Sequence, residues 1–163
     1  MTKEKLPITS AIRQLRAAGV SFTDHLYEYE EKGGTAVSAR SLNVDEYSVV
    51  KTLIMEDDAK QPLVVLMHGD KQVSTKALAR TLGVKTISPC TPEVANRHTG
   101  YMVGGTSPFG LRKTVPIYME RTILELPRIY INGGRRGYLV GLDPADAVRL
   151  LQPVLVSVAT EKA

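Results

Sequence analysis

Residues 48–55 read SVVKTLIM, and residues 63–68 read LVVLMH. Both runs are rich in β-branched and long apolar side chains, which is typical of strands buried in a sheet. The segment between them, residues 56–60, reads EDDAK, and its polar character predicts a hairpin-like turn. These two strands therefore form the centre of the fold, and the other elements are placed around them.

Helical and extended patterns alternate on both sides of this pair. Capping residues indicate four helix starts, at Thr9 or Ser10, at Ser74, at Thr91-Pro92 and at Asp143. Glycines indicate the ends of the first two helices, at Gly19 and Gly83. Residues 36–47 predict a short helix and loop, and further strands are predicted at 20–29, 115–119, 128–131 and 138–142. This order predicts an α+β protein with a compact mixed, largely antiparallel sheet or barrel-like core and helices packed outside.

Length and composition narrow the class of protein. The 163 residues fit a single domain, residues 1–163, and 43% apolar with 23% charged residues is ordinary for a globular chain. One cysteine, Cys90, excludes a disulfide framework and nearly excludes a cysteine-based zinc site, so a reducing cytoplasm is expected. No run of 18 apolar residues and no apolar leader is present, so no membrane association is expected.

The positive charge is concentrated in the second part of the chain. Residues 1–60 hold 8 basic and 10 acidic residues, whereas residues 61–163 hold 13 basic and 7 acidic ones. Such an excess is compatible with a mildly basic protein of any kind, and it also indicates a phosphate-bearing partner.

Common catalytic and cofactor motifs are absent from the sequence. Gly105 and Gly110 have the spacing of a phosphate-binding loop, but Leu111 follows where that loop needs lysine. The three histidines lack metal-ligand spacing, and neither a dinucleotide fingerprint nor a serine nucleophile elbow occurs. We therefore expect no metal and no cofactor.

Three other features remain, and each has a structural and a functional interpretation. Lys51 interrupts an apolar strand, so its ammonium group either reaches solvent or points into a pocket. The run TGYMVGGTSPFG, residues 99–110, forms either a tight turn or a backbone cradle for an oxyanion. The run NGGRRG, residues 132–137, forms either a solvated hairpin loop or a phosphate contact.

Taken together, SVVKTL at 48–53, TGYMVGGTSPFG at 99–110 and YINGGRRG at 130–137 resemble the YbaK-type aminoacyl-tRNA deacylases, relatives of the editing domain of bacterial prolyl-tRNA synthetases. The resemblance covers nearly the whole chain, because SFTDHLYEY at 21–29 is similar to the first strand of that family. It implies hydrolysis of the ester at the 3′ end of mischarged tRNA, acting in trans on cysteine attached to proline tRNA. Aminoacylated tRNA is then the expected partner, with prolyl-tRNA synthetase as a further one.

The resemblance also implies roles for particular residues. Lys51, Gly104 and Gly105 are expected to be catalytic; Tyr27, Thr52, Thr106, Ser107, Pro108 and Asn132 to bind the substrate; and Arg112, Lys113, Arg135 and Arg136, which flank the two loops, to bind tRNA. Met102 and Val103 are further candidate pocket walls. Asn132 stands where many relatives carry serine, and Leu139 where some cysteine-clearing members carry aspartate, so the amino-acid specificity is less defined than the reaction class.

The expected chemistry agrees with the residues present. An aminoacyl ester is already activated, so its cleavage needs positioning, an oxyanion cradle and a cation more than a strong enzyme nucleophile. The resemblance implies that the thiol of the substrate displaces the tRNA as a cyclic thiolactone, which makes the enzyme's own Cys90 dispensable. Two alternatives stay open: clearance of alanine or serine, and a non-catalytic module that binds tRNA or a synthetase.

Overall fold

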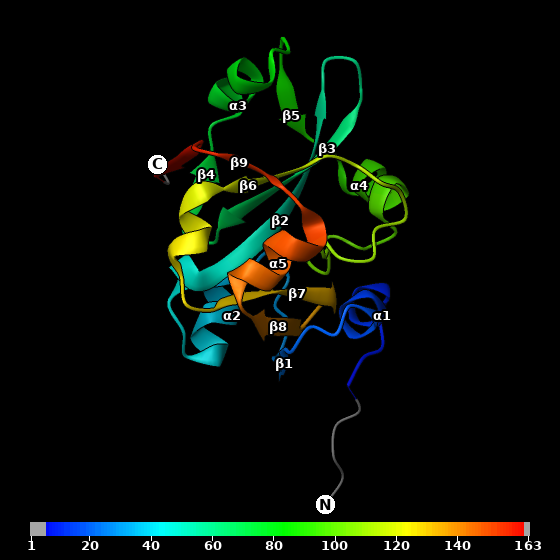
Figure 1. Cartoon of the computed structure of the whole chain (residues 1–163), viewed down its shortest axis with the longest axis vertical. Helices are drawn as coiled ribbons and strands as arrows, with labels where there is room; N and C mark the ends of the chain where they lie inside the picture. Colours follow the sequence, from blue (N-terminus) through cyan, green and yellow to red (C-terminus); the bar gives the residue numbers. More distant parts are fainter. Residues whose placement is uncertain (1–5, 162–163) are drawn as a thin grey trace, which may run out of the picture.

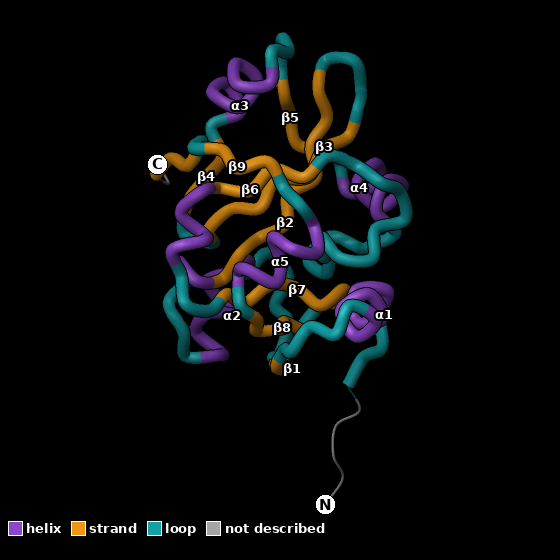
Figure 2. The backbone as a smooth tube through the Cα atoms, viewed as in Figure 1, coloured by secondary structure: helices purple, strands orange, loops and turns teal. Residues whose placement is uncertain are grey.

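The computed structural model describes residues 6–161, which alternate between short helices and strands (Figures 1 and 2). The elements in chain order are α1 (Ser10–Ala17), β1 (Thr23–Leu26), α2 (Gly34–Leu42), η1 (Glu46–Ser48), β2 (Val49–Asp57), β3 (Pro62–His68), β4 (Lys71–Val73), α3 (Thr75–Leu82), β5 (Ile87–Pro89), α4 (Pro92–Thr99), β6 (Ile117–Glu120), η2 (Arg121–Glu125), β7 (Ile129–Arg135), β8 (Tyr138–Leu142), α5 (Pro144–Leu151), β9 (Val154–Val156) and β10 (Ala159–Glu161).

The strands form one mixed eight-stranded sheet in the order β1-β8-β7-β2-β3-β6-β9, with β5 paired to β2, and a small β10-β4 sheet. The β2/β3 pair is antiparallel and places Lys51 opposite Met67, as the two apolar runs predict. The β7/β2, β3/β6 and β6/β9 pairs are parallel, and the other pairs are antiparallel. Among the described residues β1 and β9 do not pair with each other, so the sheet stays open and the barrel-like alternative is not realised.

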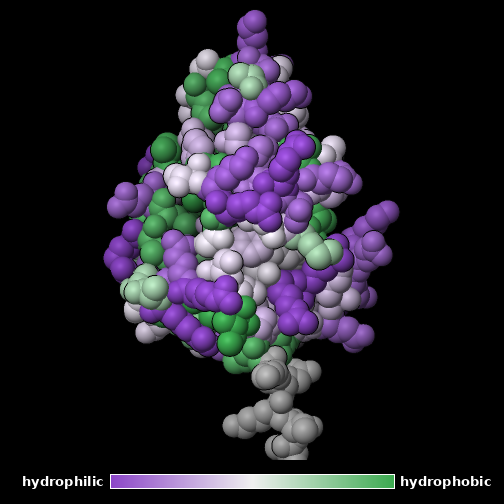
Figure 3. Space-filling model, turned by 90° about the vertical axis from the view of Figure 1, so that its right-hand side faces the viewer, coloured by the Kyte–Doolittle hydropathy of each residue, from purple (hydrophilic) through white to green (hydrophobic). Residues whose placement is uncertain are grey.

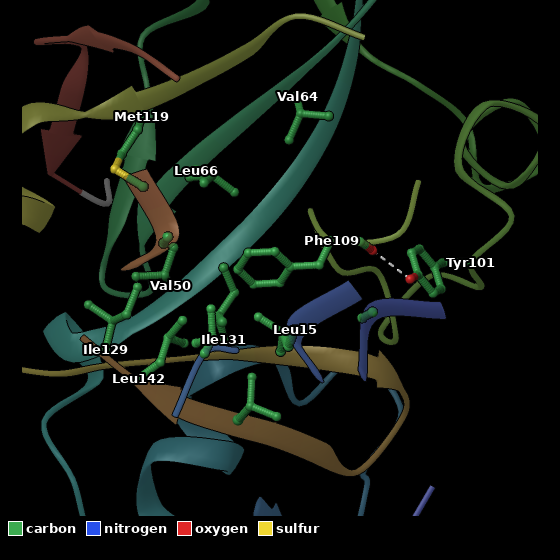
Figure 4. Packing of buried hydrophobic residues seen from close by; sticks show 14 of the residues in the cluster. Leu15, Val50, Val64, Leu66, Tyr101, Phe109, Met119, Ile129, Ile131 and Leu142 are labelled. Atoms are coloured by element: carbon green, nitrogen blue, oxygen red, sulfur yellow. Dashed lines mark hydrogen bonds between the residues drawn. The ribbon is translucent and has the colours of Figure 1, made fainter. Parts of the chain in front are cut away.

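The two faces of the sheet bury different side chains. Val50, Ile54 and Leu66 lie in the largest apolar cluster, together with residues of α1 and α5; Figure 4 shows part of its packing. Met55, Val65 and Met67 lie on the opposite face with Leu78 and Ala79 of α3. Val49 lies on that same face in a third cluster with Ala39 of α2 and Leu139 of β8. The alternation of β2 thus separates α1 and α5 from α2 and α3.

Most predicted boundaries are confirmed by capping contacts. The hydroxyls of Thr9, Ser74 and Thr91 and the carboxylate of Asp143 each accept a backbone N–H in the first turn of their helix. The first strand is shorter than residues 20–29, because only Thr23–Leu26 pair with β8. The three-residue strands β4, β5, β9 and β10 were not predicted, since runs this short carry too little pattern to distinguish them from loops.

Candidate functional site

Lys51 lies on β2 at the boundary between two apolar clusters. Along the same face of β2, Lys51 lies between Val49 and Leu53. Val49 belongs to the cluster that contains Ala39 of α2, which we call the α2 cluster. Leu53 packs against the cluster that contains Leu78 of α3, which we call the α3 cluster. The side chain is half-buried, and its Nζ donates to the carbonyl oxygen of Gly69 at 3.5 Å. The ammonium group is therefore held at the sheet face between α2 and α3.

Gly69 is itself held in place by the residues around it. Its carbonyl oxygen also accepts from the Thr35 hydroxyl at 3.1 Å, and that hydroxyl lies 2.7 Å from Oε2 of Glu46. The preceding residue, His68, is buried, and its two ring nitrogens lie 2.7 Å from the Tyr47 carbonyl and 2.7 Å from the Thr122 hydroxyl. With both nitrogens engaged, His68 supports the end of β3 and leaves no ring nitrogen for catalysis.

The edge of β2 beside Lys51 is where two neighbouring strands separate. Val49 and Val50 pair with β7, and Met55, Glu56 and Asp57 pair with β5. No strand among the described residues pairs with this edge at Lys51, Thr52 and Leu53. A β-bulge between Asn132 and Arg135 lies in the part of β7 that follows the paired residues. Bulges redirect a strand and frequently lie next to functional sites.

The glycine-rich segment is a long loop between α4 and β6 (Figure 2), and its two ends are tied together. The Tyr101 hydroxyl donates to the carbonyl oxygen of Phe109 at 2.6 Å (Figure 4), and Asn96 Nδ2 donates to the Tyr101 carbonyl at 3.0 Å. Phe109 is fully buried in the large core cluster. Residues 102–106, which we call the loop tip, therefore project from a closed base.

The loop tip is latched onto the β7–β8 hairpin and the chain after β1. Asn132 Nδ2 donates to the Gly104 carbonyl at 3.1 Å, and Arg136 Nε donates to the Val103 carbonyl at 2.8 Å. The guanidinium group of Arg136 also lies over the ring of Tyr29, 5.0 Å from its centroid. We call the contacts of Arg136 with Val103 and Tyr29 the latch.

Both glycines of the loop tip are required by this packing. Gly104 has φ +86°, and a Cβ there would lie 2.6 Å from the Tyr29 hydroxyl oxygen. A Cβ on Gly105 would lie 2.8 Å from the backbone nitrogen of Arg136. The N–H of Gly105 donates to the Met102 carbonyl at 2.8 Å, so in this conformation it serves the turn and is not directed at a ligand.

Asn132 lies on the same sheet face as Lys51 and contacts the loop tip. Val50 pairs with Ile131 in the parallel register, so the next residues along the two strands, Lys51 and Asn132, lie on the same face. Asn132 in turn binds Gly104. Lys51 and Asn132 thus lie on one face of the sheet, just beyond the last paired residues of β2 and β7, and Asn132 links that face to Gly104 of the loop tip.

Other predicted site residues lie elsewhere. Thr52 points to the opposite face from Lys51, where its hydroxyl is buried without a hydrogen-bond partner among the described residues. Ser107 and Pro108 are buried, and the Ser107 hydroxyl accepts the Phe109 N–H at 3.2 Å. Both side chains support the loop from inside, and their contact with the substrate stays a prediction. Thr106 donates to the Met102 carbonyl at 3.3 Å within the loop tip.

Tyr27 and the predicted tRNA contacts are distributed around the loop. Tyr27 packs with the α2 cluster and, with Leu26, Arg135 and Arg136, borders an open pocket of about 270 Å³. Arg112 and Lys113 are exposed at the other end of the loop, close to the end of α4. Sequence reasoning did not predict that Tyr29 contributes to the site or that Arg136 contacts Tyr29 and Val103. Tyr29 is an aromatic residue near a predicted strand, but its partner Arg136 lies more than a hundred residues away in the chain.

Cys90 and the remaining histidines do not form a nucleophilic site. Burial, with a further contribution from the negative charge of Glu56, raises the pKa of the Cys90 thiol to about 11, so it stays protonated at neutral pH. His98 pairs with Glu56 at 3.2 Å, and His25 contacts Thr23 and the edge of the Tyr130 ring. Within residues 6–161 no three His, Cys, Asp or Glu side chains are grouped so that they could hold a metal ion.

The face of the molecule that carries α1 and α4 is mostly hydrophilic (Figure 3). A region of intermediate hydropathy lies at its centre, between hydrophilic groups. Among the described residues, no helix combines the length and the apolar character needed to cross a bilayer.

Comparison with known proteins identifies the family. Residues 30–150 match the model of the aminoacyl-tRNA editing domain. The chain belongs to the aminoacyl-tRNA editing domain family. This confirms the resemblance to the tRNA deacylases and makes the protein an enzyme of tRNA proofreading.

Relatives of this editing domain are known as separate proteins and as parts of synthetases. EbsC of Enterococcus faecalis, whose name proposes a Cys-tRNA(Pro)/Cys-tRNA(Cys) deacylase, is 26% identical over 155 residues, with 94% of each chain covered. The proline–tRNA ligase of Streptococcus equi subsp. zooepidemicus is 28% identical over 128 residues, which are 77% of this chain and 21% of the ligase.

Two solved structures share the fold. A crystal structure of a hypothetical protein superposes with a TM-score of 0.85 at 25% identity, covering 93% of this chain and all of the other. A second, described as a candidate trans-editing enzyme for prolyl-tRNA synthetase, superposes with a TM-score of 0.79 at 18% identity, covering 96% of this chain and 100% of the other. The predicted α+β class is confirmed.

Proposed function

We propose that this editing domain acts in trans on cysteine attached to proline tRNA. The observation that carries the proposal is that Lys51 and Asn132 lie on one sheet face where β7 and β5 separate along β2, and that Asn132 binds Gly104. This arrangement supplies a cation, an amide and a close-packed backbone, with no enzyme nucleophile. Such a set suits an ester that is already activated. The name of EbsC, matched along 94% of the chain, supports cysteine as the amino acid.

In the proposed mechanism the substrate provides its own nucleophile. The cysteine thiol loses its proton, its sulfur bonds to the ester carbonyl carbon, and the bond from that carbon to the tRNA 3′-oxygen breaks. The tRNA oxygen takes up a proton and leaves, and water then opens the four-membered thiolactone. Lys51 stabilises the negative charge that develops on the carbonyl oxygen. Asn132 fixes the loop tip, and the loop tip limits the space around the amino acid.

The roles of the other residues follow from their positions. We propose that Lys51 is catalytic, that Gly104 and Gly105 act by allowing close approach of the loop tip, and that Tyr27 and Thr106 border the substrate. Arg135 and Arg136, two of the predicted tRNA contacts, come directly after the bulge in β7, and Arg136 reaches the loop tip at the Val103 carbonyl. The high pKa of the Cys90 thiol supports an enzyme without a thiolate of its own. We place the protein in the cytoplasm, with prolyl-tRNA synthetase as the partner that releases its substrate.

A rate comparison tests the proposal. Proline tRNA is charged separately with cysteine, serine, alanine and proline, and single-turnover deacylation is followed with wild type and with Lys51→Ala. We expect cysteine to be released fastest, because a thiol ionises far more readily than the hydroxyl of serine. Faster release of alanine than of cysteine would contradict the substrate assignment. A folded wild type that releases none of the four would make the protein a binding module.

A further inference from the structure

A groove runs between α3 and the chain that leads into β5, on a part of the molecule that the proposed site does not use. It has a volume of about 530 Å³, and its lining consists of three cations, two threonines and three small or apolar residues: Lys76, Arg80, Lys85, Thr75, Thr86, Ala79, Val84 and Ile87. Figure 1 shows α3 and β5 together at one end of the molecule, with β2 running from there toward α2.

The cations of the groove are available to a ligand. Lys76 and Arg80 are four residues apart on α3, so they lie on the same side of the helix. Both are exposed, and neither forms a salt bridge among the described residues. Two cations on one helix side, without internal partners, favour an anionic ligand.

Lys85 is presented beside them by a fixed turn. Asp58 Oδ1 accepts the backbone N–H of Lys85 at 3.0 Å and that of Thr86 at 3.4 Å. These bonds anchor the chain between α3 and β5 to the β2–β3 turn. The carboxylate of Asp58 offsets part of the positive charge, and Lys76 and Arg80 supply the remainder. The hydroxyls of Thr75 and Thr86 add donors of the kind that phosphate oxygens accept.

The helix that borders the groove packs on the same face of the sheet as Lys51. Leu78 and Ala79 of α3 pack with Met55 of β2, and Met55 lies on the Lys51 face of that strand. Ile87 pairs with Asp57, six residues along β2 from Lys51. At roughly 3.3 Å per strand residue this places the groove about 20 Å from Lys51.

We propose that the groove binds the sugar-phosphate backbone of the acceptor stem of the tRNA whose 3′ end lies at Lys51. This inference rests on the proposed function. When the unpaired 3′ end continues the stack of the acceptor stem, each nucleotide advances about 3.4 Å along the helix axis, so about 20 Å corresponds to roughly six nucleotides. That length passes the single-stranded 3′ end and reaches the first base pairs. The contact is with phosphates, so it contributes affinity and orientation and no base specificity.

The test compares two arginines in similar helix positions, of which Arg149 pairs with Asp146 at 3.4 Å and Arg80 forms no salt bridge among the described residues. Arg80 and Arg149 each lie in the last turn of an eight-residue helix, α3 and α5, on opposite faces of the sheet. Fluorescence anisotropy measures the Kd of wild type, Arg80→Glu and Arg149→Glu for two uncharged RNAs over a range of salt. One RNA is a hairpin of the proline-tRNA acceptor stem with its 3′ end, and the other is the single-stranded 3′ end alone.

We expect Arg80→Glu to raise the Kd for the hairpin at least about fivefold and to reduce the slope of log Kd against log salt by about one, the signature of a lost phosphate contact. The Kd for the single-stranded RNA stays unchanged, and Arg149→Glu behaves as wild type toward both. Thermal unfolding checks that each variant is folded. Should Arg80→Glu not fold, Lys76→Gln on the same side of α3 gives the same comparison.

Three results would overturn the inference. In the first, Arg80→Glu binds the hairpin with the affinity of wild type; in the second, Arg149→Glu loses as much affinity as Arg80→Glu. In the third, the groove binds an acidic protein, and substitutions in the groove leave the affinity for RNA unchanged. The readout is binding of uncharged RNA, so it is independent of hydrolysis. A wild type that binds the hairpin through Arg80 and fails to deacylate contradicts the proposed function alone. Rapid deacylation with no effect of Arg80→Glu contradicts the groove alone.

Discussion

Replacing Gly104 with alanine tests whether the latched loop tip is needed for activity. The new Cβ would lie 2.6 Å from the Tyr29 hydroxyl oxygen and 2.9 Å from Cε2 of the same ring. The ring end would have to move, and with it the stacking of Arg136 on Tyr29 and the hydrogen bond from Arg136 to Val103. The left-handed φ of +86° adds a backbone penalty.

The size of the effect follows from these three losses. An alanine in left-handed backbone costs about 1 kcal/mol, an exposed cation–π contact contributes about 0.5 kcal/mol, and a hydrogen bond from a charged donor about 1.5 kcal/mol. Their sum is about 3 kcal/mol against the latched conformation. At about 1.4 kcal/mol per factor of ten, kcat/KM should fall about 100-fold.

Single-turnover deacylation of Cys-tRNA(Pro) measures this effect, and two further variants separate its causes. Gly19 has φ +69°, and a Cβ added there would have nothing within 4 Å, so Gly19→Ala carries the backbone penalty alone. It should lower Tm by about 2–4 °C and leave the rate unchanged. In a Tyr29→Ala background the clash is absent, and Gly104→Ala should then cost only about fivefold, as expected for coupled neighbours.

Wild-type kcat/KM in a folded Gly104→Ala protein would refute this reasoning. An undiminished 100-fold loss in the Tyr29→Ala background would also do so, because it would show that the glycine acts without Tyr29.

Three other outcomes are expected. Lys51→Ala should retain its fold and lose at least about tenfold in deacylation rate, the effect of about 1.4 kcal/mol of lost transition-state stabilisation, and near-normal turnover would exclude its catalytic role. Cys90→Ser should clear cysteine at the wild-type rate, since the pKa of about 11 keeps the thiol protonated; inactivity of this variant would indicate an enzyme nucleophile. Arg135→Ala should weaken tRNA binding and reduce its salt dependence without lowering kcat. Anisotropy measures the binding at several salt concentrations, and single-turnover assays measure the rate. An unchanged salt slope would contradict a phosphate contact.

The sequence predicted the parts of the fold that depend on local pattern. The alternation of apolar residues in β2 placed Lys51 with Val49 and Leu53 on one face, and the clusters of the structure agree. The capping residues Thr9, Ser74 and Asp143 located helix starts, because capping is a contact within a few residues.

The candidate site was only partly predictable, because its decisive contacts join residues far apart in the chain. Lys51, Asn132 and Gly104 were found by motif, but the engagement of Arg136 with Tyr29 and Val103 depends on tertiary packing. The same alternation that located Lys51 directs Thr52 to the other face, and its contact with the substrate stays a prediction. Burial of Ser107 likewise follows from how the loop closes over Phe109.

One face of the sheet carries the α2 cluster and the α3 cluster, with Lys51 between them. This separation allows the protein to change in two respects independently. The α2 cluster, with Ala39 and Leu139, lies on the side of Lys51 that carries Asn132, whereas two cations of the groove belong to α3. The two apolar clusters are separate, so substitutions in one should combine additively with substitutions in the other. A substitution around Ala39 or Leu139 is therefore expected to leave RNA binding at the α3 groove unchanged.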